Sequence, residues 1–119
     1  MTQGALQWWV FRASLDPVMG SEQAGDRPVL IVSNEAINEA LPIVTVLPLT
    51  RHKPGRRIYS TEVLLPPEAA GQPAASIVMA HQIRTISKGR LQAAYGELVD
   101  PGLREAVRVA MRLYLDLEV

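Results

Sequence analysis

Proline and glycine constrain the fold of this chain most strongly, because they divide most of it into short apolar segments. Segments rich in β-branched and aromatic residues and bounded by turn formers are typical of β-strands. Pro48 lies near the end of one segment, which predicts an edge strand or a bulge there. Residues 34–39 are expected to form a turn with room for one helical turn. The pattern predicts strands over residues 7–15, 27–33, 42–49, 58–65, 74–80, 81–86 and 95–99.

Helical periodicity appears only at the end of the sequence. Asp100 suits the N-cap, Pro101 suits the first helical position, and Glu105 lies near the positive end of the helix dipole. The apolar stripe at helical spacing consists of Leu103, Val107, Ala110, Tyr114 and Leu117, and it is flanked by Ala106 and Met111. Short strands followed by one amphipathic helix predict a mostly β fold, a small antiparallel barrel or curled sheet with a C-terminal α-helix on its flank.

Length and charge narrow the class of protein. The 119 residues predict a single domain over residues 1–119, and the formal net charge of zero means that any polyanion site must be a local patch. The absence of cysteine and the presence of only two histidines lead us to expect no metal site and no cofactor. We also expect no signal peptide, no membrane-spanning segment and a cytoplasmic location.

Two adjacent tryptophans, Trp8 and Trp9, begin the first predicted strand. Neighbouring strand residues point to opposite faces, so we expect one of the two to anchor the core. The other would lie at the rim of the sheet or take part in self-association, because exposed aromatic residues are enriched at interfaces.

Two polar loops are candidate binding sites. Pro28 excludes helix just before it, so Arg27 is expected to be extended at the mouth of a strand, where binding groups are commonly placed. The segment 51–57 carries four fixed positive charges, which predicts contact with a polyanion, although a solvated loop is the alternative reading. Polar side chains of the first loop are Ser21, Glu22, Gln23 and Arg27, and basic side chains of the second are Arg51, Lys53, Arg56 and Arg57.

Three ordered blocks of the sequence resemble the MazF/PemK toxin family, the endoribonuclease half of bacterial toxin–antitoxin pairs. The first is Asp16-Pro17 with Gly-Ser-Glu-Gln-Ala-Gly-Asp-Arg-Pro-Val-Leu at 20–30, and the second is Ile-Val-Thr-Val-Leu-Pro-Leu-Thr at 43–50. The third is Gln-Ile-Arg-Thr-Ile-Ser-Lys-Gly-Arg-Leu at 82–91. Three ordered blocks are more specific than one short motif. The sequence departs from the family at 7–9, where Gln-Trp-Trp replaces a charged start.

The resemblance implies an SH3-like antiparallel barrel of the MazF/CcdB type that acts as a homodimer. It implies a sequence-selective, metal-independent endoribonuclease that cleaves single-stranded RNA, mRNA foremost, and a cognate MazE-like antitoxin as partner. Cleavage would proceed by attack of the 2′-hydroxyl and leave a 2′,3′-cyclic phosphate and a 5′-hydroxyl. DNA lacks this hydroxyl and cannot react in this way.

The same resemblance assigns the catalytic roles to Arg27 and Thr50. Arg27 would stabilise the charge of the transition state rather than act as a base, because a guanidinium rarely gives up its proton. Glu22 would accept the 2′-proton or, as we favour, pair with Arg27. His52 is a secondary candidate for the base, and His81 is expected to be structural. The predicted substrate-binding residues are Ser21, Glu22, Gln23, Arg51, His52, Lys53, Arg56, Arg57, Gln82 and Arg84.

Two alternatives keep the same fold without the nuclease. One is a non-catalytic toxin-like barrel that binds an antitoxin, and the other is a gyrase poison like the related CcdB toxins. A gyrase poison relies on its terminal helix and does not need Arg27 and Thr50, so this pair separates the hypotheses.

Overall fold

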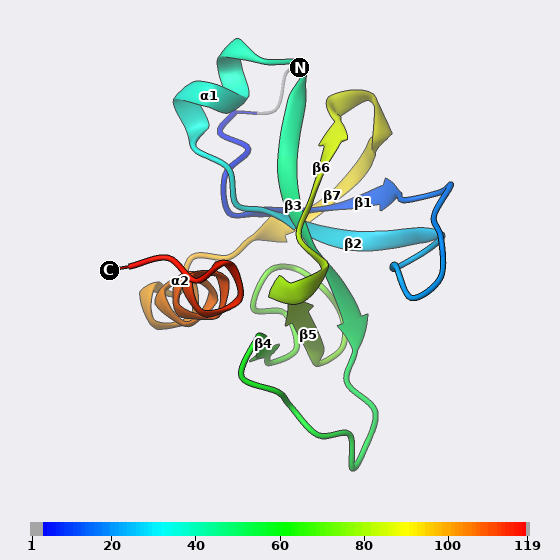
Figure 1. Ribbon diagram of the computed structural model, residues 1–119, viewed down its shortest axis with the longest axis vertical. Helices are drawn as coiled ribbons and strands as arrows, with labels where there is room; N and C mark the ends of the chain where they lie inside the picture. Colours follow the sequence, from blue (N-terminus) through cyan, green and yellow to red (C-terminus); the bar gives the residue numbers. More distant parts are fainter. Residues whose placement is uncertain (1–3, 119) are drawn as a thin grey trace.

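The computed structural model describes residues 4–118, and Figure 1 shows a strongly curled sheet with one long helix beside it. Seven strands, two α-helices and two 3₁₀ helices lie in this described part of the chain. The elements are β1 (Trp9–Ser14), β2 (Asp26–Ile31), α1 (Glu35–Ala40), β3 (Ile43–Arg51), β4 (Glu62–Leu65), β5 (Ser76–Met79), η1 (Ala80–Gln82), β6 (Arg84–Ser87), η2 (Lys88–Arg90), β7 (Leu91–Glu97) and α2 (Pro101–Leu115).

The strands pair antiparallel in the order β4–β5–β3–β2–β1–β7, with β6 joined to β3 outside this path. The long strand β3 links the two parts of the sheet. Its first half pairs with β6, where Val44 faces Ile86, and its last residues pair with β5, where Thr50 faces Ile77. The sheet does not close on itself, yet it curls into the barrel-like form predicted, so the expected fold class is confirmed.

Both faces of β5 and of much of β2 and β3 are buried, which explains why these strands read as continuous apolar runs, whereas β7 is largely exposed. Alternate residues of β1 and β2 enter two separate clusters: Val10 and Leu30 in one, Phe11 and Val29 in the other. The first cluster lies under α2, β4 and β5. Burial on two faces removes the polar alternation that a half-exposed strand would show.

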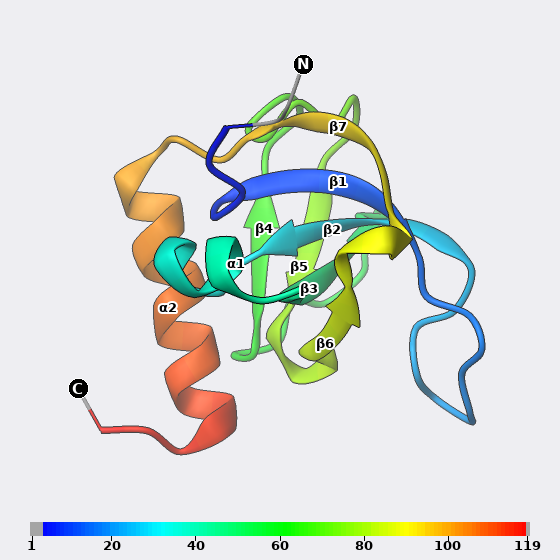
Figure 2. The ribbon, with the colours of Figure 1, turned by 90° about the horizontal axis from the view of Figure 1, so that it is seen from above.

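The C-terminal helix begins as predicted. The carboxylate of Asp100 accepts hydrogen bonds from the backbone N–H groups of Gly102 (2.7 Å) and Leu103 (3.2 Å). Figure 2 shows α2 along one side of the sheet, where it packs against β4 and η1. Val107 and Ala110 are buried, whereas the predicted stripe residue Tyr114 is 48% exposed. The apolar stripe therefore covers the core only over the first part of the helix.

The tryptophans enter different clusters. Trp8 is buried, as predicted for one of the pair, and the guanidinium groups of Arg104 and Arg108 lie 5.3 and 5.0 Å from its ring centre. Trp9 is half-buried and packs beside Phe11, with ring centres 6.5 Å apart. The sheet curls enough to cover much of both side chains.

Four sequence expectations require correction. The segment 81–86 is not a single strand, because its first residues belong to the 3₁₀ helix η1 and β6 begins only at Arg84. Pro48 lies in an inner strand, not at an edge, but it occupies the gap between the β6 pairing, which ends at Val46, and the β5 pairing, which begins at Leu49. This is where β3 changes partner. Residues 58–61 form a turn before β4, closed by the bond from the Glu62 N–H to the Tyr59 carbonyl. The last strand is Leu91–Glu97 rather than 95–99, because its pairing with β1 begins at Leu91.

Candidate active site

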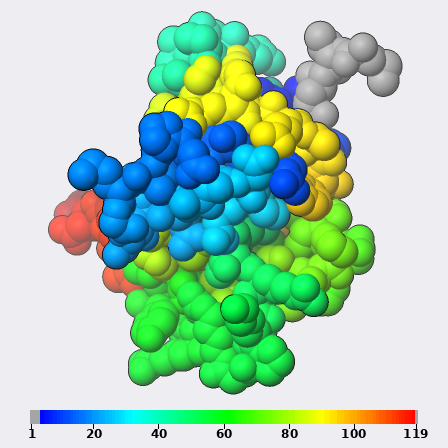
Figure 3. All heavy atoms as spheres, turned by 90° about the vertical axis from the view of Figure 1, so that its right-hand side faces the viewer, coloured from blue at the N-terminus to red at the C-terminus, as the bar shows by residue number. Residues whose placement is uncertain are grey.

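A pocket of about 440 Å³ opens between the beginning of β2 and the end of β3. It brings together three of the residues singled out from sequence: Arg27, Thr50 and Arg51. Figure 3 shows this side of the molecule, with the β1–β2 region in blue and cyan above the green segment that follows β3. The remaining lining residues are Ala24, Asp26, Pro28, Leu49, Gln72, Pro73, Ala74, Ser76 and Tyr95.

Strand register explains why Arg27 and Thr50 meet. Val29 of β2 faces Pro48 of β3, and continuing this antiparallel register by two residues places Arg27 opposite Thr50. Thr50 remains fixed there because it still pairs with Ile77 of β5. The two side chains are therefore held by paired strands rather than by mobile loops.

Only part of the Arg27 guanidinium is engaged within the protein. Its Nε donates a hydrogen bond to the carbonyl of Ala24 at 3.0 Å. This contact orients the planar group and leaves its two terminal nitrogens for a ligand, and such a fork suits the oxygens of a phosphate. Among the described residues Arg27 forms no ion pair, so the expected pairing with Glu22 is wrong. A carboxylate oxygen of Glu22 instead accepts the Met19 N–H at 2.9 Å.

The loop between β1 and β2 is tied to β6 and η1. The side-chain amide of Gln82 donates to the Ser21 carbonyl (3.2 Å) and accepts from the Gln23 N–H (3.3 Å). Arg84 donates to the carbonyl of Leu15 at 3.1 Å. These predicted substrate-binding residues lie outside the pocket lining and use polar groups to hold the loop. A contact with substrate stays a prediction for each of them.

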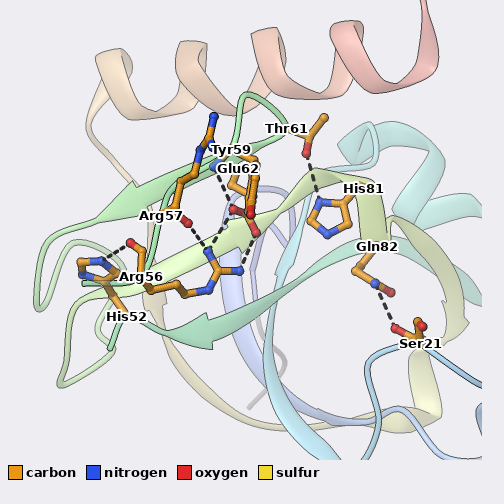
Figure 4. Close-up of polar contacts among 9 residues, drawn as sticks. All are labelled: Ser21, His52, Arg56, Arg57, Tyr59, Thr61, Glu62, His81 and Gln82. Carbon is orange, nitrogen blue, oxygen red and sulfur yellow. Dashed lines mark hydrogen bonds and ion pairs between the residues drawn. The ribbon is translucent and has the colours of Figure 1, made fainter. Parts of the chain in front are cut away.

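The basic loop after β3 is also internally bonded, as Figure 4 shows. Arg56 forms a bidentate pair with Glu62, with nitrogen–oxygen distances of 3.0 and 2.9 Å. Glu62 also accepts the Tyr59 N–H at 3.0 Å, and the Arg57 guanidinium lies 5.2 Å from the Tyr59 ring centre. The imidazole of His52 contacts the Arg56 carbonyl at 3.3 Å. Arg56 and His52 therefore shape the loop, whereas Lys53 and Arg57 are exposed.

The pair changes the acid–base behaviour of both partners. The hydrogen bond from Arg56 holds the pKa of the buried Glu62 carboxyl below its usual range, and the same bond raises the pKa of Arg56. His81 takes the structural place expected of it, because its Nδ1 lies 3.1 Å from the Thr61 hydroxyl.

Sequence patterns missed the far wall of the pocket, to which Gln72, Pro73 and Tyr95 contribute. The turn 68–72 packs directly on β7, so these residues meet through long-range contact. In the sequence, Gly71 and Gly96 could have indicated this contact, because a Cβ at Gly71 would lie 2.3 Å from the Tyr95 carbonyl oxygen. Glycine in such a place marks a close approach of two backbones.

Within residues 4–118 no group of three or more His, Cys, Asp or Glu side chains is placed to hold a metal ion. No helix in this part of the chain is both long and apolar enough to cross a bilayer.

The fold and pocket define a class: a small antiparallel β protein whose cleft offers a guanidinium and a hydroxyl to an anionic group. The sequence model of the PemK-like, MazF-like toxins of type II toxin–antitoxin systems matches residues 6–115, and the chain belongs to this family.

Named relatives agree with this assignment. Endoribonuclease EndoA of Bacillus subtilis is 34% identical over 108 residues, covering 91% of each chain. Endoribonuclease MazF of Staphylococcus saprophyticus is 33% identical over 108 residues, covering 88% of this chain and 89% of the relative. Among solved structures, a mycobacterial endoribonuclease in complex with its cognate antitoxin superimposes with a TM-score of 0.77 at 30% identity, covering 98% of this chain and 99% of that one.

Proposed function

We propose that this chain is the sequence-selective endoribonuclease toxin of a type II toxin–antitoxin pair, a single domain over residues 1–119 that acts in the cytoplasm as a homodimer. Its relatives are endoribonucleases of the same family. The observation that carries the proposal is the shared pocket of Arg27 and Thr50 at the end of the β2–β3 pair.

The proposed reaction uses the substrate's own 2′-hydroxyl and requires no metal. The O2′ atom attacks the adjacent phosphorus, the bond from phosphorus to O5′ breaks, and one proton passes from O2′ to the leaving O5′ through a base and an acid. The products are a 2′,3′-cyclic phosphate and a 5′-hydroxyl. The two terminal nitrogens of Arg27 stabilise the charge on the phosphorane oxygens, and the Thr50 hydroxyl donates to one of them.

Local charge attracts the RNA to a protein with no net charge. Arg51 extends the cationic side of the pocket, and Lys53 and Arg57 continue it along the exposed loop. Arg56 contributes less, because its charge is paired with Glu62. Contacts of this kind bind the phosphate backbone without reading sequence.

A MazE-like antitoxin is the proposed regulatory partner. The mycobacterial relative of 30% identity was solved in complex with its cognate antitoxin. Occupation of the pocket by an antitoxin segment would exclude RNA, because both ligands would need the same cationic groups.

Incubation of the protein with mixed-sequence RNA in excess chelator, followed by mapping of all new ends, tests the proposal. We expect cuts at one short sequence, with 5′-hydroxyl ends. Arg27→Ala should lower kcat by about 100- to 1,000-fold, because it removes a preorganised charge from the transition state. Arg112→Ala is the matched control, because it removes an arginine from α2, outside the pocket.

Three outcomes would contradict the proposal: a need for magnesium, 5′-phosphate ends, or undiminished cleavage by Arg27→Ala. If expression of the protein arrests growth while the cellular RNA stays uncut, the result would instead support a non-catalytic toxin or a gyrase poison.

A further inference from the structure

We propose that Tyr95 forms the wall of a base subsite, in which one unpaired base next to the scissile phosphate stacks on its ring. The inference rests on the proposed function and deepens it, because it names a residue that would decide which sequence is cut.

The pocket is larger than a phosphate group requires. Its volume of about 440 Å³ falls in the range of roughly 300–1,000 Å³ that is typical of pockets for organic ligands. A phosphate held by Arg27 and Thr50 would fill only one part of it. A nucleotide has its base directly attached through the sugar, so the remaining space lies within reach of that base.

The chemistry of the remaining lining suits a base and not a phosphate. Pro28, Pro73 and Tyr95 are apolar or aromatic lining residues, which offer no favourable contact to an anion, whereas Leu49 is buried in the core beneath them. Tyr95 is the aromatic residue among the lining residues that the structure describes. Single-stranded RNA is commonly bound by stacking of its bases on such rings, while basic residues follow the backbone.

The Tyr95 wall is held in place before any ligand arrives. Tyr95 is half-buried and packs against the core cluster under α2. Next to it the turn 68–72 lies against β7 so closely that a Cβ at Gly96 would be 3.0 Å from the Ala70 carbonyl oxygen. A preorganised wall loses little freedom on binding, so stacking there contributes nearly its full value.

The part of the wall next to Tyr95 is equally fixed. Gln72 is 2% exposed, and its amide accepts the Ala70 N–H (2.8 Å) and donates to the carbonyls of Pro66 (2.8 Å) and Ala74 (3.3 Å). All its hydrogen-bonding groups serve the turn, so Gln72 positions Pro73 and Ala74 rather than reading the RNA.

A binding cycle with abasic RNA tests the subsite. The probe is a single-stranded RNA that contains the mapped cleavage site, with a 2′-deoxy nucleotide at the scissile position so that it binds without being cut. Each base that flanks the scissile phosphate is removed in turn, and the Kd of each RNA is measured by fluorescence anisotropy for the wild type, Tyr95→Phe and Tyr95→Leu. Tyr114→Leu on the exposed part of α2 is the control for loss of a tyrosine.

For the wild type, Tyr95→Phe and Tyr114→Leu, we expect loss of one particular flanking base to weaken binding by about 5- to 100-fold. For Tyr95→Leu the same loss should cost less than twofold, because the ring on which the base stacks is absent. In cleavage of mixed-sequence RNA, Tyr95→Leu should also lose base preference at that one position.

Equal penalties in the wild type and Tyr95→Leu would overturn the subsite and leave the nuclease proposal standing. If Tyr95→Leu does not give a cooperative thermal unfolding transition, Tyr95→Met replaces it, because this flexible side chain fills irregular space. Failure of the wild type to cut any RNA would overturn the proposed function and the subsite with it, whereas equal penalties in a protein that cuts RNA would overturn the subsite alone.

Discussion

At the scale of single residues, the pocket depends on two side chains that the β2–β3 register places opposite each other. Arg27 has one nitrogen anchored to the Ala24 carbonyl, and Thr50 is held by the pairing with Ile77. It matters that both side chains are oriented before the substrate binds, because a transition state is stabilised most by groups that need not reorganise.

Removal of the Thr50 hydroxyl should lower activity without damage to the strand. Thr50→Val keeps the β-branched shape but loses a hydrogen bond to a charged oxygen, which is worth about 1.5–3 kcal/mol, or roughly 10- to 150-fold in kcat/KM. Thr50→Ser should retain most activity. Thr45→Val is the matched control on the same strand, because its hydroxyl bonds to that of Thr85, outside the pocket. Equal activity of Thr50→Val and the wild type would exclude a role for the hydroxyl.

At the scale of elements, the loop between β3 and β4 is closed by a buried ion pair. The side chain of Glu62 is 1% exposed and that of Arg56 is 32% exposed. The pair and the bond to Tyr59 hold the middle and the end of the loop against the first residue of β4.

Glu62→Gln should destabilise the fold by about 1.5–3 kcal/mol, the usual contribution of a hydrogen bond to a charged group. The loss should not exceed this range, because Arg56 is 32% exposed and can turn toward solvent, so no unpaired charge stays buried. The hydrogen bond from Arg56 keeps the pKa of Glu62 low, so the contribution of the pair is complete above the ordinary glutamate pKa of about 4.3 and is lost as the pH falls below it. The difference in unfolding free energy between wild type and variant should therefore shrink below about pH 4. Urea titrations across pH, with the surface variant Glu105→Gln as control, measure this. A constant difference down to pH 3 would contradict the account.

The contact between the turn 68–72 and β7 has its own test. Gly55 and Gly71 both have positive φ, 80° and 81°, but only at Gly71 would an added Cβ meet another backbone. Gly55→Ala should cost about 1–2 kcal/mol for the left-handed conformation alone. Gly71→Ala should cost clearly more, because the Tyr95 carbonyl must also move. Equal losses of stability in urea unfolding would show that the close contact is unimportant.

At the scale of the whole molecule, the sequence predicts those features of the fold that depend on residues close together in the chain. Most of the apolar segments, the cap at Asp100 and the position of Arg27 at the beginning of its strand are local features, and the structure confirms them. Pairing partners are not local, so the sequence predicts an edge or a bulge at Pro48 and does not predict the Tyr95 wall. Side chains that bond internally, such as Arg56 and Gln82, could not be distinguished by sequence from those that face the pocket.

The central claim is that Arg27 and Thr50 act on a phosphate attacked by its neighbouring 2′-hydroxyl. The most direct measurement compares two synthetic RNAs that contain the mapped cleavage site and differ only in a 2′-deoxy nucleotide at the scissile position, with products identified by mass spectrometry. The account predicts a 2′,3′-cyclic phosphate and a 5′-hydroxyl from the all-ribose RNA, and no cleavage of the deoxy-substituted one. Cleavage of the deoxy-substituted RNA at the same bond would contradict it.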